Sequence, residues 1–439
     1  MDKKKISLVS LGHLSCDVNG GALPAILPFL RTHYGLTYQA TGGLMFAYSC
    51  LSSIIQPLFG LMADRLSKPW LIPLGVFLAG IGLAAVGFMS SYWAIFAAIG
   101  LSGVGAALFH PEGARFANKV SGQSKGTGMS IFSIGGNAGF VIGPLLATFF
   151  LSWFGMPGTA VFGLLATVMA SILTLLIMRM VAPEAAAAAQ RTAQAAYGNS
   201  NSATGMPSAM LPADEAAARS GEAPAKEFAA GAADGAALDV KDDASDVLKN
   251  NWREFSKLTG AIIARSILFI GFNTFIPLYW VNGFGQSRAA GAVALTVFCT
   301  FGVMSNILGG VLADRYGFRA IVRLGFALVT PVVLAFSLMP SLYAAYAMLP
   351  LLGFVLYAPF SSLVVLGQTY LARNIGFASG VTLGLATSLG GVFAPVLGWV
   401  ADNHGLPRTF QCLALVALVG TVFAFSLRKY EEKKKPAKA

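Results

Sequence analysis

The chain has 439 residues, of which 56% are apolar and 11% are charged, and its formal net charge is +11. Soluble globular domains carry about one-quarter charged residues, so the composition excludes an ordinary soluble domain and indicates an integral membrane protein. The few cysteines stand singly in apolar stretches, which predicts packing residues and not a disulfide or metal framework: Cys16, Cys50, Cys299 and Cys412.

Twelve apolar runs follow one another along the chain. Each is long enough, at about 1.5 Å per helical residue, to cross a hydrocarbon core of about 30 Å. The runs are continuous and do not alternate with period two, so they predict helices and not the strands of a barrel. The first run follows MDKKK without a small-residue cleavage site, which predicts a retained span. The runs are 6–30, 42–62, 70–89, 93–118, 126–151, 157–180, 258–281, 289–312, 321–339, 342–367, 376–400 and 408–427.

The basic residues are distributed unevenly between the loops that these spans define. With a cytoplasmic N-terminus, all 30 Lys and Arg lie on the cytoplasmic side except Arg265, which is within a span, and Arg31, Arg288 and Arg408, which are outside. Because cytoplasmic loops are enriched in Lys and Arg, we expect a multi-pass protein of the inner (plasma) membrane with both termini cytoplasmic. The positive charge therefore orients the chain in the lipid bilayer and does not indicate nucleic-acid binding.

Residues 182–256 interrupt the pattern with Ala-, Gly-, Ser- and Pro-rich sequence and with most of the acidic residues. A polar, low-complexity segment of this kind predicts a disordered cytoplasmic linker. The predicted organisation is a six-helix bundle at 1–181, this linker at 182–256, a second six-helix bundle at 257–428 and a basic cytoplasmic tail at 429–439. Two bundles around one pathway suffice for a monomer.

The two halves repeat each other. GLMADR at 60–65 recurs as GVLADR at 310–315, and GPLLA at 143–147 corresponds to APVLG at 394–398. Duplication in a twelve-span chain is typical of two bundles arranged around a central path. The carboxylate of each Asp-Arg loop can accept hydrogen bonds from the exposed N–H groups of a neighbouring helix, which predicts a latch between the bundles; a loop that only anchors a turn is the alternative. The predicted gating residues are Asp64, Arg65, Asp314 and Arg315.

The loops GLMADRLSKPW and GVLADRYGFRA resemble the signature of the major facilitator superfamily between spans 2 and 3 and between spans 8 and 9. Within that superfamily, HLSCD, LPAILPFL, SSIIQPLFGLMADR, LFHPEGARFA and SIFSIGGNAGFVIGPLLA resemble the fosmidomycin resistance family of drug exporters. The likeness covers nearly all of both halves but not the linker. It implies an all-α fold of twelve transmembrane helices in two six-helix bundles, a cavity lined by spans 1, 4, 7 and 10, and proton-driven efflux of small molecules.

Of the 19 acidic residues, only Asp17 and Glu112 lie well inside a span. A charge at the membrane centre costs about 2.5–3.5 kcal/mol or more, so an ionisable residue there is a functional candidate. His13 shares a helix face with Asp17 at i, i+4, and a bend at Pro111 could turn His110 and Glu112 toward the cavity together. Because such groups can trade protons, the predicted proton-coupling residues are Asp17, His13, Glu112 and His110.

Each of these residues also has a structural interpretation. Glu112 could pair with Arg115 three residues further along the helix, and His13 and Asp17 could be satisfied hydrogen-bond partners of the packing. Both interpretations remain open from the sequence.

Arg265 is the single Lys or Arg within a span, and a permanent positive charge there needs an anion. It could bind an anionic group of the cargo, or it could neutralise Asp17 or Glu112 while the cavity is empty. Several polar residues within other spans could also contact cargo, although ordinary interhelical hydrogen bonding is the alternative for each. The predicted substrate-binding residues are Arg265, Gln56, Asn137, Asn273, Tyr279 and Gln368.

The fifth span, GGNAGFVIGP, has small residues at a spacing of four. Such a row lets two helices approach closely, and a proline adds a kink. The span also resembles the antiporter motif of the superfamily, which implies export. The predicted packing residues are Gly135, Gly139, Gly143 and Pro144.

The chain has no G-x-x-x-x-G-K-[ST] phosphate loop, which argues against ATP as the energy source. We therefore predict a secondary transporter that exchanges protons for a small molecule, with no enzyme activity, cofactor or resident metal. Proton-coupled import of an organic anion is the nearest alternative. An intramembrane metal enzyme or metal carrier that uses two histidines and two carboxylates is a remote one, and a receptor or scaffold is another.

Overall fold

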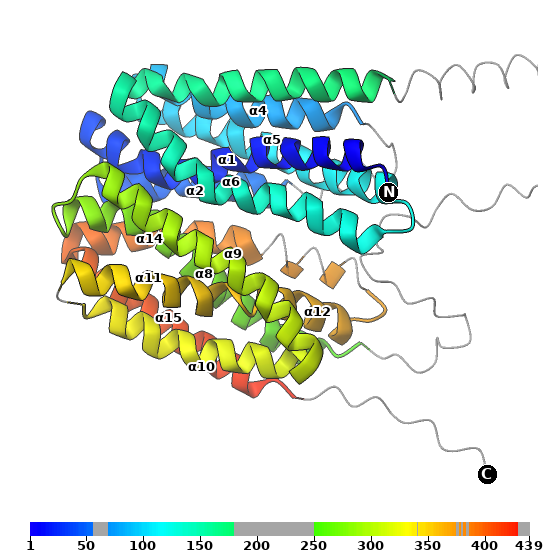
Figure 1. Ribbon diagram of the computed structural model, residues 1–439. Helices are drawn as coiled ribbons and strands as arrows, with labels where there is room; N and C mark the ends of the chain where they lie inside the picture. The colour runs from blue at the N-terminus through cyan, green and yellow to red at the C-terminus, as the bar shows by residue number, and fades with distance from the viewer. Residues whose placement is uncertain are drawn as a thin grey trace, which may run out of the picture. The chain divides into compact units, whose positions relative to one another are not determined.

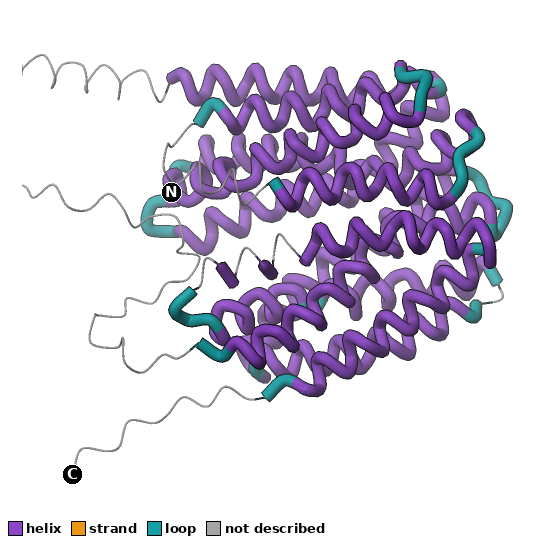
Figure 2. The backbone as a smooth tube through the Cα atoms, turned by 180° about the vertical axis from the view of Figure 1, so that it is seen from behind, coloured by secondary structure: helices purple, strands orange, loops and turns teal. Residues whose placement is uncertain are grey.

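The computed structural model describes residues 1–55, 69–179, 250–339, 341–374, 377–378, 381–382 and 386–428. Met1–Leu173 and Leu238–Ala439 belong to one compact unit, and Thr174–Ala237 to another. Over the described residues the chain is helical, and the tube in Figure 2 shows helices joined by short loops without a strand.

Helix α1 begins, and helix α15 ends, at the same end of the helices (Figure 1). We call the opposite end the far end. The helix that follows α6 runs over Met156–Arg179. The twelve α-helices with both ends among the described residues are α1 (Lys3–Tyr34), α2 (Tyr38–Ile54), α4 (Leu71–Ala85), α5 (Tyr92–Ser121), α6 (Lys125–Phe154), α8 (Trp252–Asn282), α9 (Arg288–Tyr316), α10 (Phe318–Ser337), α11 (Leu342–Tyr357), α12 (Phe360–Tyr370), α14 (Ala386–His404) and α15 (Leu406–Ser426).

The turns at the far end repeat in the two halves. Gly35 and Gly285 both have a positive φ, 62° and 65°, a conformation that glycine adopts without a steric penalty. Two residues later, Thr37 caps α2 and Ser287 caps α9, each accepting a hydrogen bond from the amide three positions on. The repeat read from the sequence therefore extends to the residues that end and begin the helices.

Nine helices among the described residues are long and apolar enough to cross a membrane. They carry many large apolar side chains on their outer surfaces, such as Trp93, Trp153, Leu164 and Tyr343, a distribution that suits contact with lipid. Helix α1 has the length but is too polar to be counted among the nine, since His13, Asp17 and Asn19 lie in its middle. The predicted fold class, with twelve spans in two bundles, is confirmed.

Helices α1 and α6 pack closely in the first bundle, as do α9 and α11 in the second. The predicted glycine row of α6 faces the backbone of α1: a Cβ atom on Gly139 would lie 2.7 Å from the amide N of Val18, and one on Gly143 would lie 2.7 Å from that of Ala22. Gly135 faces Ser10 in the same way, and α6 continues through Pro144. The two halves meet where α2 packs on α14 and α6 on α9.

Most helices extend a few residues beyond the predicted runs, and two differences change the predicted organisation. Helix α8 begins at Trp252, inside the predicted linker, because the Oδ1 atom of Asn251 accepts a hydrogen bond from the amide of Glu254 at 3.1 Å. The predicted span 342–367 is divided into α11 and α12 at Pro359, which cannot donate a backbone hydrogen bond. Residues 182–249 of the predicted linker and the predicted tail 429–439 lie outside the described residues.

Candidate functional site

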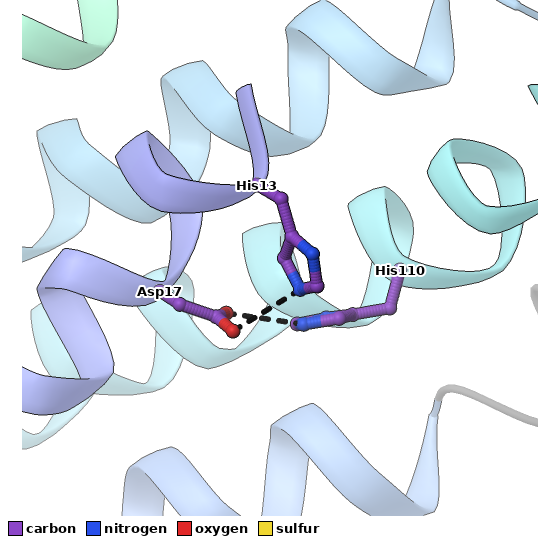
Figure 3. A group of neighbouring side chains, drawn as sticks. All are labelled: His13, Asp17 and His110. Atoms are coloured by element: carbon purple, nitrogen blue, oxygen red, sulfur yellow. Dashed lines mark ion pairs between the residues drawn. The ribbon is translucent and has the colours of Figure 1, made fainter. Parts of the chain in front are cut away.

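Two helices bring three ionisable side chains together inside the first bundle (Figure 3). On α1, the Nε2 atom of His13 lies 3.2 Å from Oδ2 of Asp17, one turn further along the helix. From α5, the Nε2 atom of His110 lies 3.1 Å from Oδ1 of the same carboxylate. Each oxygen of Asp17 therefore faces a different imidazole, and we call these three residues the His-Asp-His cluster.

The hydrogen bond of Nδ1 in each imidazole shows which ring nitrogen carries the hydrogen in the neutral form. Nδ1 of His13 lies 2.8 Å from the carbonyl oxygen of Phe132, and Nδ1 of His110 lies 2.7 Å from that of Ala106. A carbonyl oxygen can only accept, so both Nδ1 atoms carry a hydrogen. In a neutral ring Nε2 then has only a lone pair, which faces a carboxylate oxygen and gains no hydrogen bond.

The hydrogen bonds of the cluster therefore depend on how many protons it holds. With both imidazoles protonated, each Nε2–H donates to Asp17 and the net charge is +1. With no extra proton, two lone pairs face the carboxylate, the net charge is −1, and this geometry loses its hydrogen bonds.

Burial strengthens the dependence of these hydrogen bonds on the protonation of the cluster, because little water is available to replace them. Asp17 is only 6% exposed and His13 only 8% exposed, and the His13 ring stacks on Phe132 with the centroids 4.1 Å apart. Helix α6 closes the cluster where it has no side chain: a Cβ atom on Gly136 would lie 2.5 Å from Nε2 of His13 and 2.7 Å from Oδ2 of Asp17. A charge that water cannot reach is stabilised only by its neighbours.

Glu112 is not brought into this cluster. Its Oε2 atom accepts a hydrogen bond from Nε of Arg115 at 3.0 Å, and its Oε1 atom pairs with Nη2 of the same residue. This is the i, i+3 arrangement that the sequence left open. Helix α5 continues through Pro111. The second carboxylate required for the two-histidine, two-carboxylate metal site is thus paired with Arg115 instead.

A cavity of about 130 Å³ lies between the halves. Its wall combines hydroxyl and amide groups with aromatic and apolar side chains, and none of its lining residues is charged. The Tyr48 hydroxyl lies against Gly20, one turn along α1 from Asp17, so the cavity approaches the His-Asp-His cluster. The lining residues are Gly20, Pro24, Met45, Tyr48, Ser49, Ser52, Ser53, Phe140, Phe269, Ile270 and Asn273.

Arg265 lies behind the cavity wall. Its guanidinium Cζ is 4.6 Å from the ring centroid of Phe360 and 5.9 Å from that of Phe269, which lines the cavity. The side chain is 6% exposed, and among the described residues its Nε has no hydrogen-bond partner and its guanidinium forms no ion pair. The predicted neutralisation of Asp17 or Glu112 by Arg265 is not seen, since these carboxylates pair with other residues.

The other predicted cargo contacts are in different places. Asn273 lines the cavity and donates to the carbonyl of Phe269 at 2.8 Å. Tyr279 packs among aromatic rings, 4.6 Å from Phe284 and 5.0 Å from Phe410 between centroids. Asn137 on α6 and Gln368 on α12 are half-buried and do not line the cavity, and Gln56 lies outside the described residues.

The predicted gating loops are only partly visible. Asp64 and Arg65 lie outside the described residues. Asp314 and Arg315 are exposed in the last turns of α9, and the Arg315 guanidinium lies 5.4 Å from the ring centroid of Tyr316. In the described part of the chain neither side chain forms an ion pair with the other bundle.

Sequence reasoning missed the hydroxyl groups of the cavity, namely Tyr48, Ser49, Ser52 and Ser53 on α2. Their signal was weak but present. In TGGLMFAYSCLSS, residues 41–53, the polar side chains at 41, 48, 49, 52 and 53 recur at intervals of three, four or seven residues, a helical spacing that marks one face.

Two bundles of spanning helices around a cavity, with ionisable groups buried beside it, define a membrane carrier of small molecules. The family model described as Major Facilitator Superfamily matches residues 9–395, and the chain belongs to this superfamily. It is therefore a multi-pass secondary transporter and not an enzyme.

Relatives of similar length are known. The chain is 26% identical to the fosmidomycin resistance protein of Escherichia coli (strain K12) over 420 residues, which cover 96% of this chain and 92% of that protein. It is also 26% identical to YfnC, an uncharacterized MFS-type transporter of Bacillus subtilis (strain 168), over 433 residues that cover 96% of this chain and 91% of YfnC.

Solved structures share the fold. A bacterial homologue of the human lysosomal transporter Spinster, in an inward-facing and occupied conformation, superimposes with a TM-score of 0.71 at 14% identity and covers 96% of each chain. The nucleoside transporter NupG gives a TM-score of 0.67 at 15% identity, covering 97% of this chain and 100% of its own. At these identities the likeness concerns the fold alone.

Proposed function

We propose that this transporter is a proton-coupled antiporter that exports small anionic or amphiphilic molecules, phosphonate-type antibiotics among them, by alternating access. It works as a monomer in the inner membrane with both termini in the cytoplasm. The observation that carries the proposal is the His-Asp-His cluster, whose hydrogen bonds exist only with extra protons and which adjoins the cavity through Gly20 and Tyr48.

The proposed direction and cargo are supported by the relatives. One of them is named for fosmidomycin resistance, and shorter matches are named as multidrug resistance proteins. The cavity supports an amphiphile, since Ser49, Ser52 and Asn273 offer hydrogen bonds while Phe140 and Phe269 offer apolar contact. Arg265 adds a positive potential behind Phe269, which favours an anion.

One observation favours the opposite direction of coupling for an anionic cargo. The protonated cluster carries a charge of +1, so it attracts an anion to the neighbouring cavity, and binding proton and anion together is the requirement of a symporter. Proton-coupled import is therefore the second candidate function.

Accumulation in proteoliposomes separates the two functions. An antiporter concentrates fosmidomycin in vesicles with an acidic lumen, because protons leave as the cargo enters. A symporter concentrates it in vesicles with an alkaline lumen, because both enter together. The result expected here is uptake into the acidic lumen, and equal uptake under the two gradients would contradict proton coupling of either sign.

Gly136→Ala is expected to reduce gradient-driven uptake in the same vesicles by about tenfold or more. The added methyl group would lie within 3 Å of His13 and Asp17 and must push them apart. The control is Ile134→Ala on the same helix, because the Ile134 side chain is 60% exposed on the outer surface and is not part of the cluster. Uptake by Gly136→Ala at the level of this control would show that the cluster geometry does not matter.

A further inference from the structure

Asp402, in the last turn of α14, joins the two halves at the far end. Its Oδ1 atom accepts a hydrogen bond from the backbone N–H of Tyr38, and its Oδ2 atom accepts one from that of Gln39, both at 2.8 Å. Tyr38 and Gln39 are the first residues of α2 in the other bundle. A single carboxylate thus spans the boundary between the bundles with two charge-assisted hydrogen bonds.

These two amides have no other way to be satisfied within α2. The first N–H groups of a helix lack partners in the helix itself. Thr37 supplies one partner, since its Oγ1 atom accepts from the amide of Ala40 at 3.1 Å, and Asp402 supplies the other two. The negative carboxylate is also attracted by the positive end of the α2 dipole.

The surrounding contacts close the same end. Nη1 of Arg31 on α1 lies 3.4 Å from Oδ1 of Asn282 on α8, and the Arg288 guanidinium lies 4.5 Å from the ring centroid of Phe29. At Gly398, one turn before Asp402, a Cβ atom would collide with the carbonyl oxygen of Tyr38. Helices α2 and α14 therefore touch at their backbones beside Asp402.

The sequence around Asp402 repeats the signature of the gating loops. GWVAD at 398–402 is a third copy of the G-x-x-A-D pattern found in GLMAD at 60–64 and GVLAD at 310–314. This copy stands at the opposite end of the helices from GVLAD, which lies in the last turns of α9. By the offset of 251 between GPLLA and APVLG, the equivalent of Asp402 in the first half is Leu151, so one half alone supplies the carboxylate.

We propose that Asp402 is the latch of the far-end gate: its carboxylate caps α2 in the closed state and must release the two amides when the carrier opens there. The mechanism is the one that the sequence predicted for the Asp-Arg loops, with a carboxylate of one bundle on the helix N-terminus of the other. It rests on the two-bundle fold and on no assumption about cargo or protons.

Distances between spin labels test the latch in the full-length chain, with the native cysteines replaced and labels at His33 and Ala289. Both positions are exposed at the far end, on α1 and α9 of different halves. Asp402→Asn keeps the shape, but its amide N–H₂ group cannot accept from a backbone N–H. The variant is expected to raise the population of a longer, open distance by about tenfold, the size of a lost helix cap.

Two further variants sharpen the test. Asn403→Ala is the matched control and should keep the parent distances, because among the described residues the Asn403 amide bonds to the carbonyl of Trp399 in its own helix and not to the other bundle. Gly398→Val should open the far end with the carboxylate intact, by wedging α14 from Tyr38. Parent distances in Asp402→Asn, with or without opening in Gly398→Val, would overturn the proposal.

If Asp402→Asn cannot be recovered as a folded protein, Asp402→Glu takes its place. Its carboxylate lies one methylene out of register with the two amides, so a smaller shift in the same direction is expected, and parent distances would again overturn the latch. All distances are measured without cargo and without a pH gradient. A failure here therefore leaves proton coupling untouched, and loss of proton coupling leaves the latch untouched.

Discussion

Asp17→Asn is expected to abolish proton-driven accumulation of cargo while leaving the exchange of cargo for cargo intact. The Asn amide carries no charge, so a protonated imidazole beside it loses its counter-ion and both rings are expected to stay neutral, while the Asn N–H₂ group can donate to the lone pair of a neutral Nε2. For each coupled proton, a gradient of one pH unit supports about tenfold accumulation in the parent. The variant should reach none, measured as uptake of fosmidomycin into vesicles with an acidic lumen.

Glu112→Gln is the informative comparison for this variant. Since Glu112 already pairs with Arg115 on its own helix, neutralising it should leave most of the gradient-driven uptake in place. Equal loss in both variants would return Glu112 to the coupling machinery. Continued accumulation by Asp17→Asn would remove the cluster from it.

The spans and the repeat could be predicted because each rests on a local property of the sequence. A helix that crosses lipid needs about 20 apolar residues, and duplication keeps residues such as Gly35 and Gly285 at one spacing. The pairing of His13 with Asp17 could also be predicted, because few ionisable residues lie within the spans and these two are one helical turn apart. The third member of the cluster, His110, was expected to reach the cavity through a bend at Pro111, whereas helix α5 continues through that residue.

What the sequence left open depended on which partner a side chain finds in three dimensions. From the sequence, Glu112 could either pair with Arg115 at i+3 or face the cavity. In the structure it pairs with Arg115. From the sequence, a cargo-binding role for Tyr279 could not be distinguished from a packing role. Its aromatic partners Phe284 and Phe410 come from a loop and from α15, which are distant along the chain or outside the helix. Asp402 falls between the predicted spans 376–400 and 408–427, and nothing local showed that the N-terminus of α2 lies beside it.

Arg265→Ala is expected to weaken the binding of an anionic cargo by about tenfold more than the binding of a neutral one. The guanidinium has aromatic rings of Phe269 and Phe360 as neighbours and, among the described residues, no counter-ion. Cation–π contacts contribute about 2 kcal/mol when desolvated, whereas burying an unpaired ion costs several. The expected reason for the difference is that the field of this unpaired charge reaches the cavity beyond Phe269.

Competition between fosmidomycin and a neutral diester of the same phosphonate measures this difference, because both occupy the same cavity and differ mainly in charge. Arg265→Lys is the matched variant: it retains the charge but not the flat group that stacks on Phe360, so it should keep much of the preference for the anion. Arg265→Gln removes the charge, keeps a polar group and should behave as Ala does. Equal losses for anion and diester in all three variants would show that Arg265 packs the second bundle and does not select cargo.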